Sequence, residues 1–309
     1  MQRRTRKSSP KRSHRFGGDW TTQKLDVLSR YLVAYTTALK NSPSPEHPFS
    51  KWYIDAFAGT GYRTLRTASK SDDIGLLFPD IAAPEPQELL DGSARLALKC
   101  KPPFERYVFI ERDMDRCAGL RELTSEFPDV ADRVDVRQGD ANTEIQALCT
   151  RDWRADRAVL FVDPYGMQVE WRTIEAIANT RAIDMWLLFP LGIGVGRLLK
   201  RDGDVPPEWR HRLDTILPQC NWYDAFYRVD RVPTLFGGDE EHVERASVES
   251  IGKFFNERLK DIFPGVAEAP AVLRNSKNCP LYLLCFAASN ERGAPIALKI
   301  ANHILKGLH

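Results

Sequence analysis

Four short motifs place acidic side chains or glycines directly after apolar segments that have the composition of buried strands. The motifs begin at Asp55 (Asp-Ala-Phe-Ala-Gly-Thr-Gly), Glu111 (Glu-Arg-Asp), Gln138 (Gln-Gly-Asp-Ala-Asn) and Asp163 (Asp-Pro-Tyr-Gly). In an open α/β sheet, ligands bind at the carboxyl ends of the strands. Together the four motifs predict one polar site along that edge of a sheet.

The first motif predicts a close approach between the backbone and a ligand. Gly59 and Gly61 flank Thr60 shortly after Asp55 and Phe57. Glycine lets a backbone amide reach a ligand without a Cβ in the way. A simple turn after the strand is the alternative interpretation of this glycine pair.

The second and third motifs each have a ligand-binding and a structural interpretation. Glu111 can accept hydrogen bonds from both hydroxyls of a ribose, as the acidic residue of nucleotide-binding βαβ units does. The alternative is a helix N-cap, which Asp113 fits better. Around Asp140, Ala141 and Asn142, a carboxylate or amide side chain beside a backbone amide can contact the edge of an adenine ring. A capped turn explains these residues equally well.

The fourth motif, Asp163-Pro164-Tyr165-Gly166, predicts a corner of hydrogen-bond acceptors beside a flat ring. Pro164 fixes its own φ and biases Asp163 toward an extended conformation, so the carboxylate and the local carbonyls can face a cleft. Such a corner suits an exocyclic amino group of a planar base, with Tyr165 stacked on the base and the acceptors orienting the amine lone pair toward an electrophile. The alternative is a tight turn with Tyr165 in the core.

Several common nucleotide-binding, hydrolase and metal motifs are absent from the sequence. The G-x-G-x-x-G fingerprint is missing because position 64 is threonine, and neither G-x-x-x-x-G-K-[ST] nor G-x-S-x-G occurs. Dehydrogenase, P-loop NTPase and α/β-hydrolase functions are therefore disfavoured. The six cysteines form no C-x-x-C pair and the six histidines show no ligand spacing, so no metal site is predicted.

These motifs need a scaffold in which apolar strands alternate with helices. The expected strands are at residues 52–58, 107–111, 134–137, 159–163 and 185–190. Helical periodicity fills the gaps and also precedes the first strand, at residues 20–40, 93–99, 115–126, 143–150 and 173–179. This alternation predicts an α/β fold, a Rossmann-like, doubly wound and mostly parallel sheet with helices on both faces.

Four regions are expected along the chain. They are a basic tail, an N-terminal helical extension, the Rossmann-like core, and a C-terminal helical segment with a β-hairpin, at residues 1–15, 16–50, 51–205 and 206–309. The hairpin either closes the sheet with antiparallel strands or belongs to a small winged-helix module with the last helix. A longer stretch before the second strand, at 62–90, has the composition of an insertion over one rim of the sheet.

The charge is concentrated at the N-terminus. Seven of the first 15 residues are basic and the first acidic residue is Asp19, although the net charge is only +2. This tail either contacts phosphates or is a solvated segment that aids solubility. No apolar run approaches the roughly 18 residues of a membrane helix, and no secretory signal is evident, so a cytoplasmic location is the expectation.

In their order along the chain, the four motifs resemble motifs one to four of class I S-adenosylmethionine-dependent methyltransferases, over residues 51–190. The resemblance implies that the glycine loop holds the methionine part of the cofactor, Glu111 its ribose, and Asp140 with Ala141 its adenine. Residues 163–166 would form the methyl-acceptor site. The form Asp-Pro-Tyr-Gly is similar to that of guanine-N2 tRNA methyltransferases.

Over nearly the whole chain, the sequence resembles the three-Cys-motif partner proteins. The resemblance includes Gly18-Asp19-Trp20 with Lys24-Leu25, and Leu90-Asp-Gly-Ser at the end of the insertion. It implies an accompanying iron–sulfur protein of the radical type, which carries the cysteines. Asp55 and Glu111 are 56 residues apart, against about 20 in compact βαβ units. Glu111 can serve the ribose only if the insertion loops out of the crossover.

Two functions from different classes follow. The first is an enzyme that transfers a methyl group from S-adenosylmethionine to an exocyclic amine of a nucleic acid base. Methyl transfer needs mainly alignment and exclusion of water, so the lack of a catalytic histidine counts little against it. The second is a noncatalytic Rossmann-like module that binds a partner protein and keeps the cofactor pocket as a regulatory or vestigial site.

Overall fold

The structure is a computed structural model that describes residues 19–60, 92–217, 222–233 and 239–308. The basic tail at 1–15 and the predicted insertion at 62–90 lie outside the described residues, as does Gly61.

Five parallel strands form the centre of the main sheet. Their order is β3-β2-β1-β4-β5, and every neighbouring pair is parallel. β5 is buried along its whole length, as expected of a strand covered on both faces. All five predicted strands are confirmed to within a few residues, as β1 (Ser50–Asp55), β2 (Arg106–Glu111), β3 (Val134–Gln138), β4 (Asp156–Val162) and β5 (Ile183–Phe189).

Antiparallel strands from the C-terminal region complete this sheet. β10 (Pro280–Ala288) pairs antiparallel with β5 along one edge, and with β8 (Gly265–Val266) and β9 (Ala271–Arg274) along its other edge. The predicted hairpin therefore closes the sheet, and a separate winged-helix module does not form. The expected fold class, an α/β fold with a Rossmann-like, mostly parallel sheet and antiparallel C-terminal strands, is confirmed.

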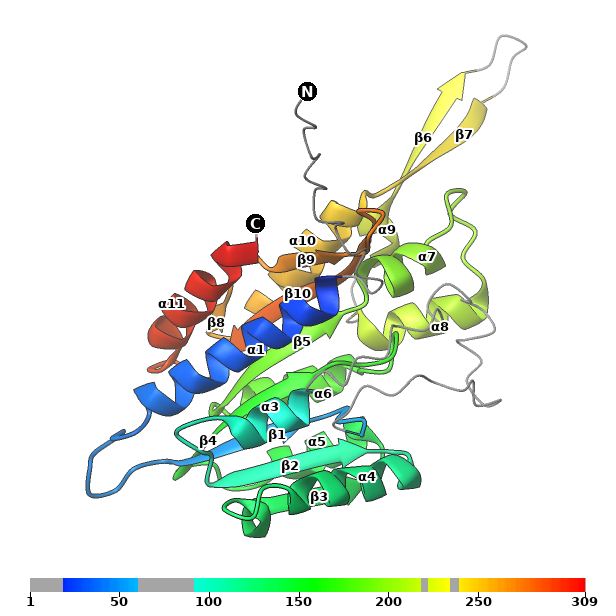
Figure 1. Ribbon diagram of the computed structural model, residues 1–309. Coiled ribbons are helices and arrows are strands. Elements are labelled where there is room, and N and C mark those ends of the chain that lie inside the picture. Colours follow the sequence, from blue (N-terminus) through cyan, green and yellow to red (C-terminus); the bar gives the residue numbers. More distant parts are fainter. Residues whose placement is uncertain (1–18, 61–91, 218–221, 234–238, 309) are drawn as a thin grey trace, which may run out of the picture.

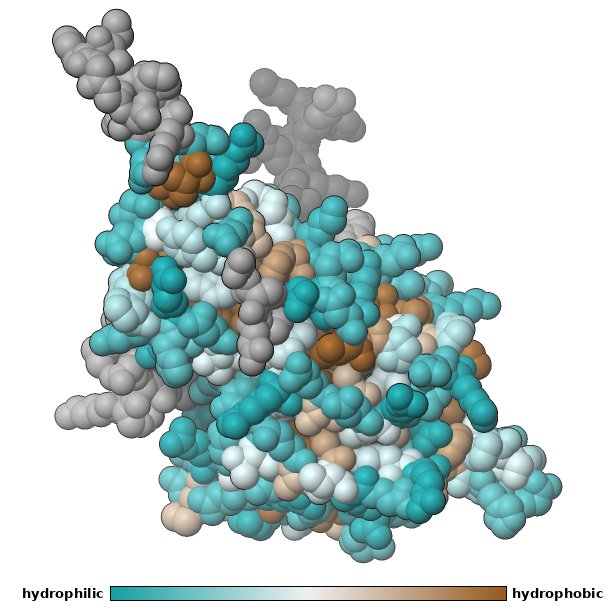
Figure 2. Space-filling model, turned by 180° about the vertical axis from the view of Figure 1, so that it is seen from behind, coloured by the Kyte–Doolittle hydropathy of each residue, from teal (hydrophilic) through white to brown (hydrophobic). Residues whose placement is uncertain are grey.

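Helices cover both faces of the sheet, so the core consists of two apolar layers (Figure 1). Figure 2 views the molecule from behind, where the surface is mostly hydrophilic and its apolar side chains form small separate patches. One layer lies under α1 (Asp19–Ala38), α3 (Ser93–Lys99), α4 (Met114–Ser125) and α11 (Ala294–Leu305). The other lies under α5 (Ala141–Cys149), α6 (Trp171–Asn179) and α10 (Val248–Lys260).

The segment between β5 and α10 contains elements that the sequence pattern did not predict. A two-stranded antiparallel hairpin projects from the body as an arm (Figure 1). Its base is anchored by Arg245, whose Nη1 donates to the carbonyl oxygens of Gly196 at 3.1 Å and Leu199 at 2.7 Å. The segment comprises a π-helix (Leu191–Val195), α7 (Gly196–Leu198), α8 (Pro207–Ile216), α9 (Trp222–Phe226), β6 (Tyr227–Pro233) and β7 (Asp239–Arg245).

Asp184, near the start of β5, holds the middle of α1 against the sheet. The Tyr31 hydroxyl donates to Asp184 Oδ2 at 2.7 Å, and both residues are buried. Burial raises the pKa of Asp184 to about 7, although the Tyr31 hydrogen bond and the charge of Arg157 oppose the rise. The attachment of α1 therefore depends on a carboxyl group whose ionised form is poorly solvated.

Asp184→Asn should make the protein less sensitive to rising pH. The folded-state pKa of about 7 exceeds the ordinary value of 3.8. The folded chain therefore keeps a proton that the unfolded chain loses, and stability falls as pH rises from about 4 to about 7. Asparagine keeps an oxygen for Tyr31 and cannot ionise, so the variant should melt a few degrees above wild type at pH 8. Thermal denaturation of both proteins at pH 5 and pH 8 measures this, and identical pH dependence would contradict it.

Two further observations concern the described part of the chain. None of its helices combines the length and the apolar character needed to cross a membrane. None of its histidine, cysteine, aspartate and glutamate side chains gather in threes as a metal site would require.

Candidate functional site

The polar ends of the parallel strands meet at one edge of the sheet. Asp55 pairs in register with Phe109 on β2 and with Phe161 on β4, and Glu111 with Gln138 on β3. Backbone hydrogen bonds join the segments that follow these strands: Ala56 N–H donates to the Phe161 carbonyl oxygen at 3.0 Å, Ala58 N–H to that of Ile110 at 3.1 Å, and Gly139 N–H to that of Glu111 at 3.0 Å. The predicted convergence of the motifs follows from this strand order.

The glycine loop after β1 contains a left-handed glycine. Gly59 has φ +63°, a conformation that disfavours other residues, and no described atom beyond Gly59 and its two chain neighbours lies within 4 Å of the position that a Cβ would occupy. Phe57 is half-buried and packs against the apolar layer under α5 and α6. The Thr60 side chain faces Gly119 of α4. Among the described residues, therefore, no side chain fills the space beside Gly59.

Glu111 connects this loop to the end of β2. It is buried, and its Oε2 accepts from the Gly59 N–H at 3.0 Å while its Oε1 accepts from the Asp113 N–H at 2.9 Å. Arg116 lies 3.8 Å from Oε1. Asp113, not Glu111, is the N-cap of α4, as its side chain accepts from the Arg116 N–H. β1 and β2 are adjacent despite their separation in sequence, so Glu111 reaches the glycine loop.

Asp55 is fully buried at the end of β1. Burial raises its pKa to about 6; hydrogen bonds from Ser93 and Tyr53 oppose the rise, and the negative charge of Asp163 adds to it. The Tyr53 hydroxyl donates to Asp55 Oδ2 at 3.0 Å. The electrostatic effect of Asp163 on Asp55 indicates that the first and fourth motifs are close enough to interact.

The third motif forms a capped turn, which was the structural interpretation of its residues. Asp140 is exposed and caps α5, its Oδ1 accepting from the Thr143 N–H at 3.1 Å. Ala141 is buried in the first turn of that helix. Asn142, whose amide was a candidate for contact with adenine, is also buried and bonds to the segment after β4 instead.

The fourth motif lies in the acceptor segment, which we define as residues 163–170. Pro164 is buried, Gly166 has φ +72°, and Tyr165 is 49% exposed. The interpretation of Tyr165 as a core residue is therefore wrong, and its ring lies at the surface. Asp163 is half-buried, and its side chain is 23% exposed.

Lys24 is a site residue to which sequence reasoning gave no role. Its Nζ lies 2.5 Å from Asp163 Oδ2 and 4.7 Å from the centre of the Trp20 ring. Trp20 in turn packs on Tyr282 of β10, with ring centres 5.0 Å apart. Lys24 occupies the buried stripe of α1 together with Leu28. A lysine in a buried stripe is unusual unless it is paired, and that was the signal available in the sequence.

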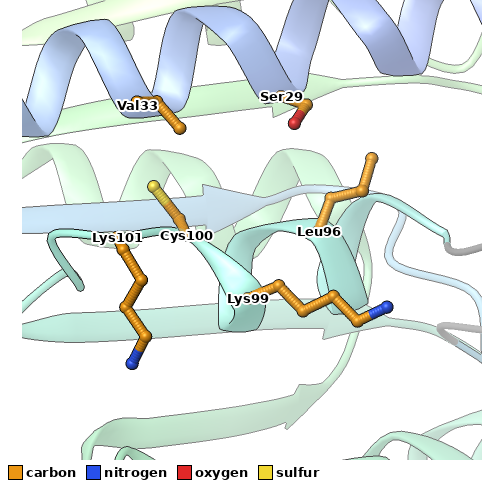
Figure 3. A pocket seen from close by; sticks show the side chains of 6 residues that line it. All are labelled: Ser29, Val33, Leu96, Lys99, Cys100 and Lys101. Atoms are coloured by element: carbon orange, nitrogen blue, oxygen red, sulfur yellow. The ribbon is translucent and has the colours of Figure 1, made fainter.

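A hollow of about 340 Å³ lies apart from this edge, between α1 and the end of α3 (Figure 3). The ammonium groups of Lys99 and Lys101 point away from α1, while Leu96 and the Cys100 thiol point toward it. The hollow is lined by Ser29, Val33, Leu96, Lys99, Cys100 and Lys101. None of the residues predicted for the site lines it, so it is a separate feature of the α1 surface.

No family model matches the sequence, and no curated protein matches it. Among solved structures, the chain is similar to a Legionella pneumophila protein of the family-model DUF519, with 13% identity over 94% of this chain and 93% of that one and a TM-score of 0.47. Spermidine synthase from Thermotoga maritima is 10% identical over 86% of this chain and 60% of that one, with a TM-score of 0.37. A methyltransferase from Geobacter sulfurreducens is 15% identical over 71% and 78%, with a TM-score of 0.26.

Proposed function

We propose that the protein is an S-adenosylmethionine-dependent methyltransferase that acts on an exocyclic amine of a nucleic acid base. The observation that carries the proposal is the position of two motifs at the ends of adjacent strands. The open glycine loop follows β1 and the Asp163-Pro164-Tyr165 corner follows β4. In a sheet of this type, a cofactor and its acceptor meet at the carboxyl edge.

The residues present fit such a cofactor. The proposed roles are the glycine loop (Asp55, Phe57, Gly59, Thr60 and Gly61) for the methionine part, Glu111 for the ribose, and the turn at Asp140 and Ala141 for the adenine. Each Glu111 oxygen accepts one backbone N–H, and a carboxylate oxygen has a second lone pair that can accept a ribose hydroxyl. No side chain of the described residues occupies the space beside Gly59, where we propose that the methionine part lies.

The chain's own residues then align the acceptor. Bound S-adenosylmethionine supplies a methyl group on a sulfonium that is already a strong electrophile. Tyr165, exposed beside the carboxylate, stacks on the base, and Asp163 accepts a hydrogen bond from its amine, which directs the nitrogen lone pair. Asp163 or water takes the proton that the amine loses. Lys24 shares Asp163 with the amine, because it already contacts Oδ2.

Glu111→Gln should weaken cofactor binding without unfolding the protein. The amide retains one acceptor oxygen but turns an NH₂ group toward either Gly59 or Asp113, each of which presents an N–H donor. We expect the dissociation constant for S-adenosylmethionine to rise at least about tenfold. Calorimetric titration measures the change. Asp113→Ala, which removes only the helix cap, should keep wild-type affinity, and equal affinities in all three proteins would contradict the role of Glu111.

The nucleic acid acceptor and the partner protein are further parts of the proposal. Basic residues in the tail at 1–15 would contact phosphates, so binding to a polynucleotide should weaken steeply with salt. The resemblance to three-Cys-motif partner proteins adds an iron–sulfur protein as a binding partner.

One observation favours the noncatalytic alternative, in which the module binds a partner protein and keeps a regulatory or vestigial pocket. The groups that would contact the acceptor and the ribose already have protein partners: Lys24 pairs with Asp163, and Glu111 bonds to Gly59 and Asp113. Polar groups that hydrogen-bond to one another need no ligand to satisfy them, so such a pocket can persist in a protein that catalyses no reaction.

Incubation of the purified full chain with methyl-labelled S-adenosylmethionine and fractionated cellular RNA, DNA and protein separates these functions. The proposed function predicts label in RNA or DNA, and base analysis should place it on an exocyclic amine. Label only in protein would refute the nucleic acid acceptor. Cofactor binding without label in any fraction would favour the noncatalytic module.

A further inference from the structure

Asn142 links the first turn of α5 to the acceptor segment and to the helix that follows it. Its Nδ2 donates to the Gln168 carbonyl oxygen at 2.8 Å, and its Oδ1 accepts from the Glu170 N–H at 3.0 Å and from the Thr173 hydroxyl at 2.9 Å. The side chain is buried. A buried amide whose donor and acceptor are both paired restricts the segments that it joins.

The hydrogen bonds continue from this point to the exposed ring. Gln168 Oε1 accepts from the Tyr165 N–H at 3.2 Å, and the carbonyl of the same glutamine accepts from Asn142. Two amide side chains in series therefore connect α5 to Tyr165. Asp163 lies two residues before Tyr165, on the far side of the rigid Pro164.

The other end of this connection is the turn proposed to receive adenine. Asp140 caps α5, and Ala141 directly precedes Asn142. A ring bound against this turn would restrict its backbone. Because Asn142 belongs to the same turn, that restriction would pass to residues 168–170 through a single side chain.

We propose that Asn142 is a positioning residue that couples the adenine end of the cofactor site to the acceptor segment, so that cofactor binding orders Asp163 and Tyr165 for the base. The inference rests on the proposed function for the identity of the cofactor. It implies an order of binding in which the cofactor precedes the acceptor. Asn142 itself touches no reacting atom.

Hydrogen–deuterium exchange of residues 163–170 tests the coupling in the full chain. In Asn142→Ala, the Glu170 amide should exchange about tenfold faster than in wild type, because it loses its acceptor. S-adenosylhomocysteine should slow exchange of the segment in wild type and should not do so in the variant.

Asn256→Ala is the matched control. Asn256, on α10, is another buried amide. Its Nδ2 donates to the Ala267 carbonyl oxygen at 3.0 Å. Its removal should lower stability but leave exchange at 163–170 and its response to the ligand unchanged.

Gln168→Ala replaces Asn142→Ala as the test variant if Asn142→Ala does not fold. Gln168 is exposed, so its truncation should be tolerated. That variant should lose ligand-dependent protection at Tyr165 and retain it at Glu170.

The outcomes separate this inference from the proposed function. Equal protection by S-adenosylhomocysteine in wild type and Asn142→Ala would overturn the coupling and leave the function standing, as would full protection of Tyr165 in Gln168→Ala. Failure of wild type to bind S-adenosylhomocysteine would overturn both. Loss of protection in Asn256→Ala equal to that in Asn142→Ala would reduce Asn142 to a structural role.

Discussion

Asp163→Ala should slow methyl transfer by about 10²–10⁴, while binding of S-adenosylmethionine stays within about twofold of wild type. In the proposed arrangement, the carboxylate lies on the acceptor side of the site, beside exposed Tyr165, whereas the glycine loop and Glu111 contact the cofactor. Removing a group that aligns and deprotonates a nucleophile costs about 10²–10⁴ in rate. Single-turnover transfer of labelled methyl to the acceptor fraction, together with calorimetry, measures both quantities.

Asp152→Ala is the control for this experiment. Asp152 precedes β4 and pairs with Arg154 on an exposed surface, so both transfer and cofactor binding should be unchanged. Wild-type transfer by Asp163→Ala would refute its role. A parallel loss of transfer and cofactor binding would place Asp163 in the cofactor site instead.

Lys24→Met should destabilise the protein and also slow transfer at least tenfold. The ammonium group is buried against the Trp20 ring, and Asp163 is partly shielded from water. Removing one partner of such a pair leaves a poorly solvated charge, so the cost should be about 2 kcal/mol, below that of fully buried pairs. Slower transfer follows because Asp163 loses the contact that fixes its orientation.

A double-mutant cycle with Asp163→Asn isolates the interaction. Urea denaturation of wild type, both single variants and the double variant should give a coupling free energy of about 1–2 kcal/mol. The same cycle on the exposed pair Arg154 and Asp152 should give less than about 0.5 kcal/mol. Equal coupling in the two cycles would contradict the structural importance of the Lys24 contact.

The fold could be predicted because the apolar sequence pattern of the core strands matches their burial in the folded chain. β5 is apolar at nearly every position because helices cover both of its faces, and the same holds for most of β1 and β4. The strand-end motifs could be found for the same reason, since each polar residue interrupts such a run. Asp55, Glu111 and Asp163 then converge because parallel strands end at one edge.

The arm could not be predicted because its strands lack a continuous apolar pattern. β7 begins Asp-Glu-Glu-His, and β6 contains three charged residues and only two valines, in the order Arg-Val-Asp-Arg-Val. Such strands pair through the backbone, and Val229 remains 47% exposed. Because these strands bury little apolar surface, their sequence lacks the apolar pattern by which a strand is predicted. The register that unites β6 and β7 is fixed by pairing across the hairpin, which a single sequence does not display.

The missing parts of the site are contacts between distant segments. Lys24 and Asp163 are 139 residues apart, and Asn142 contacts residues 26 to 31 positions away. Nothing in the local sequence of either residue identifies its partner. Lys24 and Asn142 are both buried polar residues. Burying such a residue without a partner costs free energy, and in each case the fold supplies a partner from a distant segment.

Calorimetric titration of the full chain with S-adenosylmethionine shows directly whether the carboxyl edge of β1, β2 and β3 binds that compound, as we propose. We expect saturable binding of one molecule per chain, weakened in Glu111→Gln and retained in Asp163→Ala. Absence of binding, or binding that Glu111→Gln leaves unchanged, would contradict it.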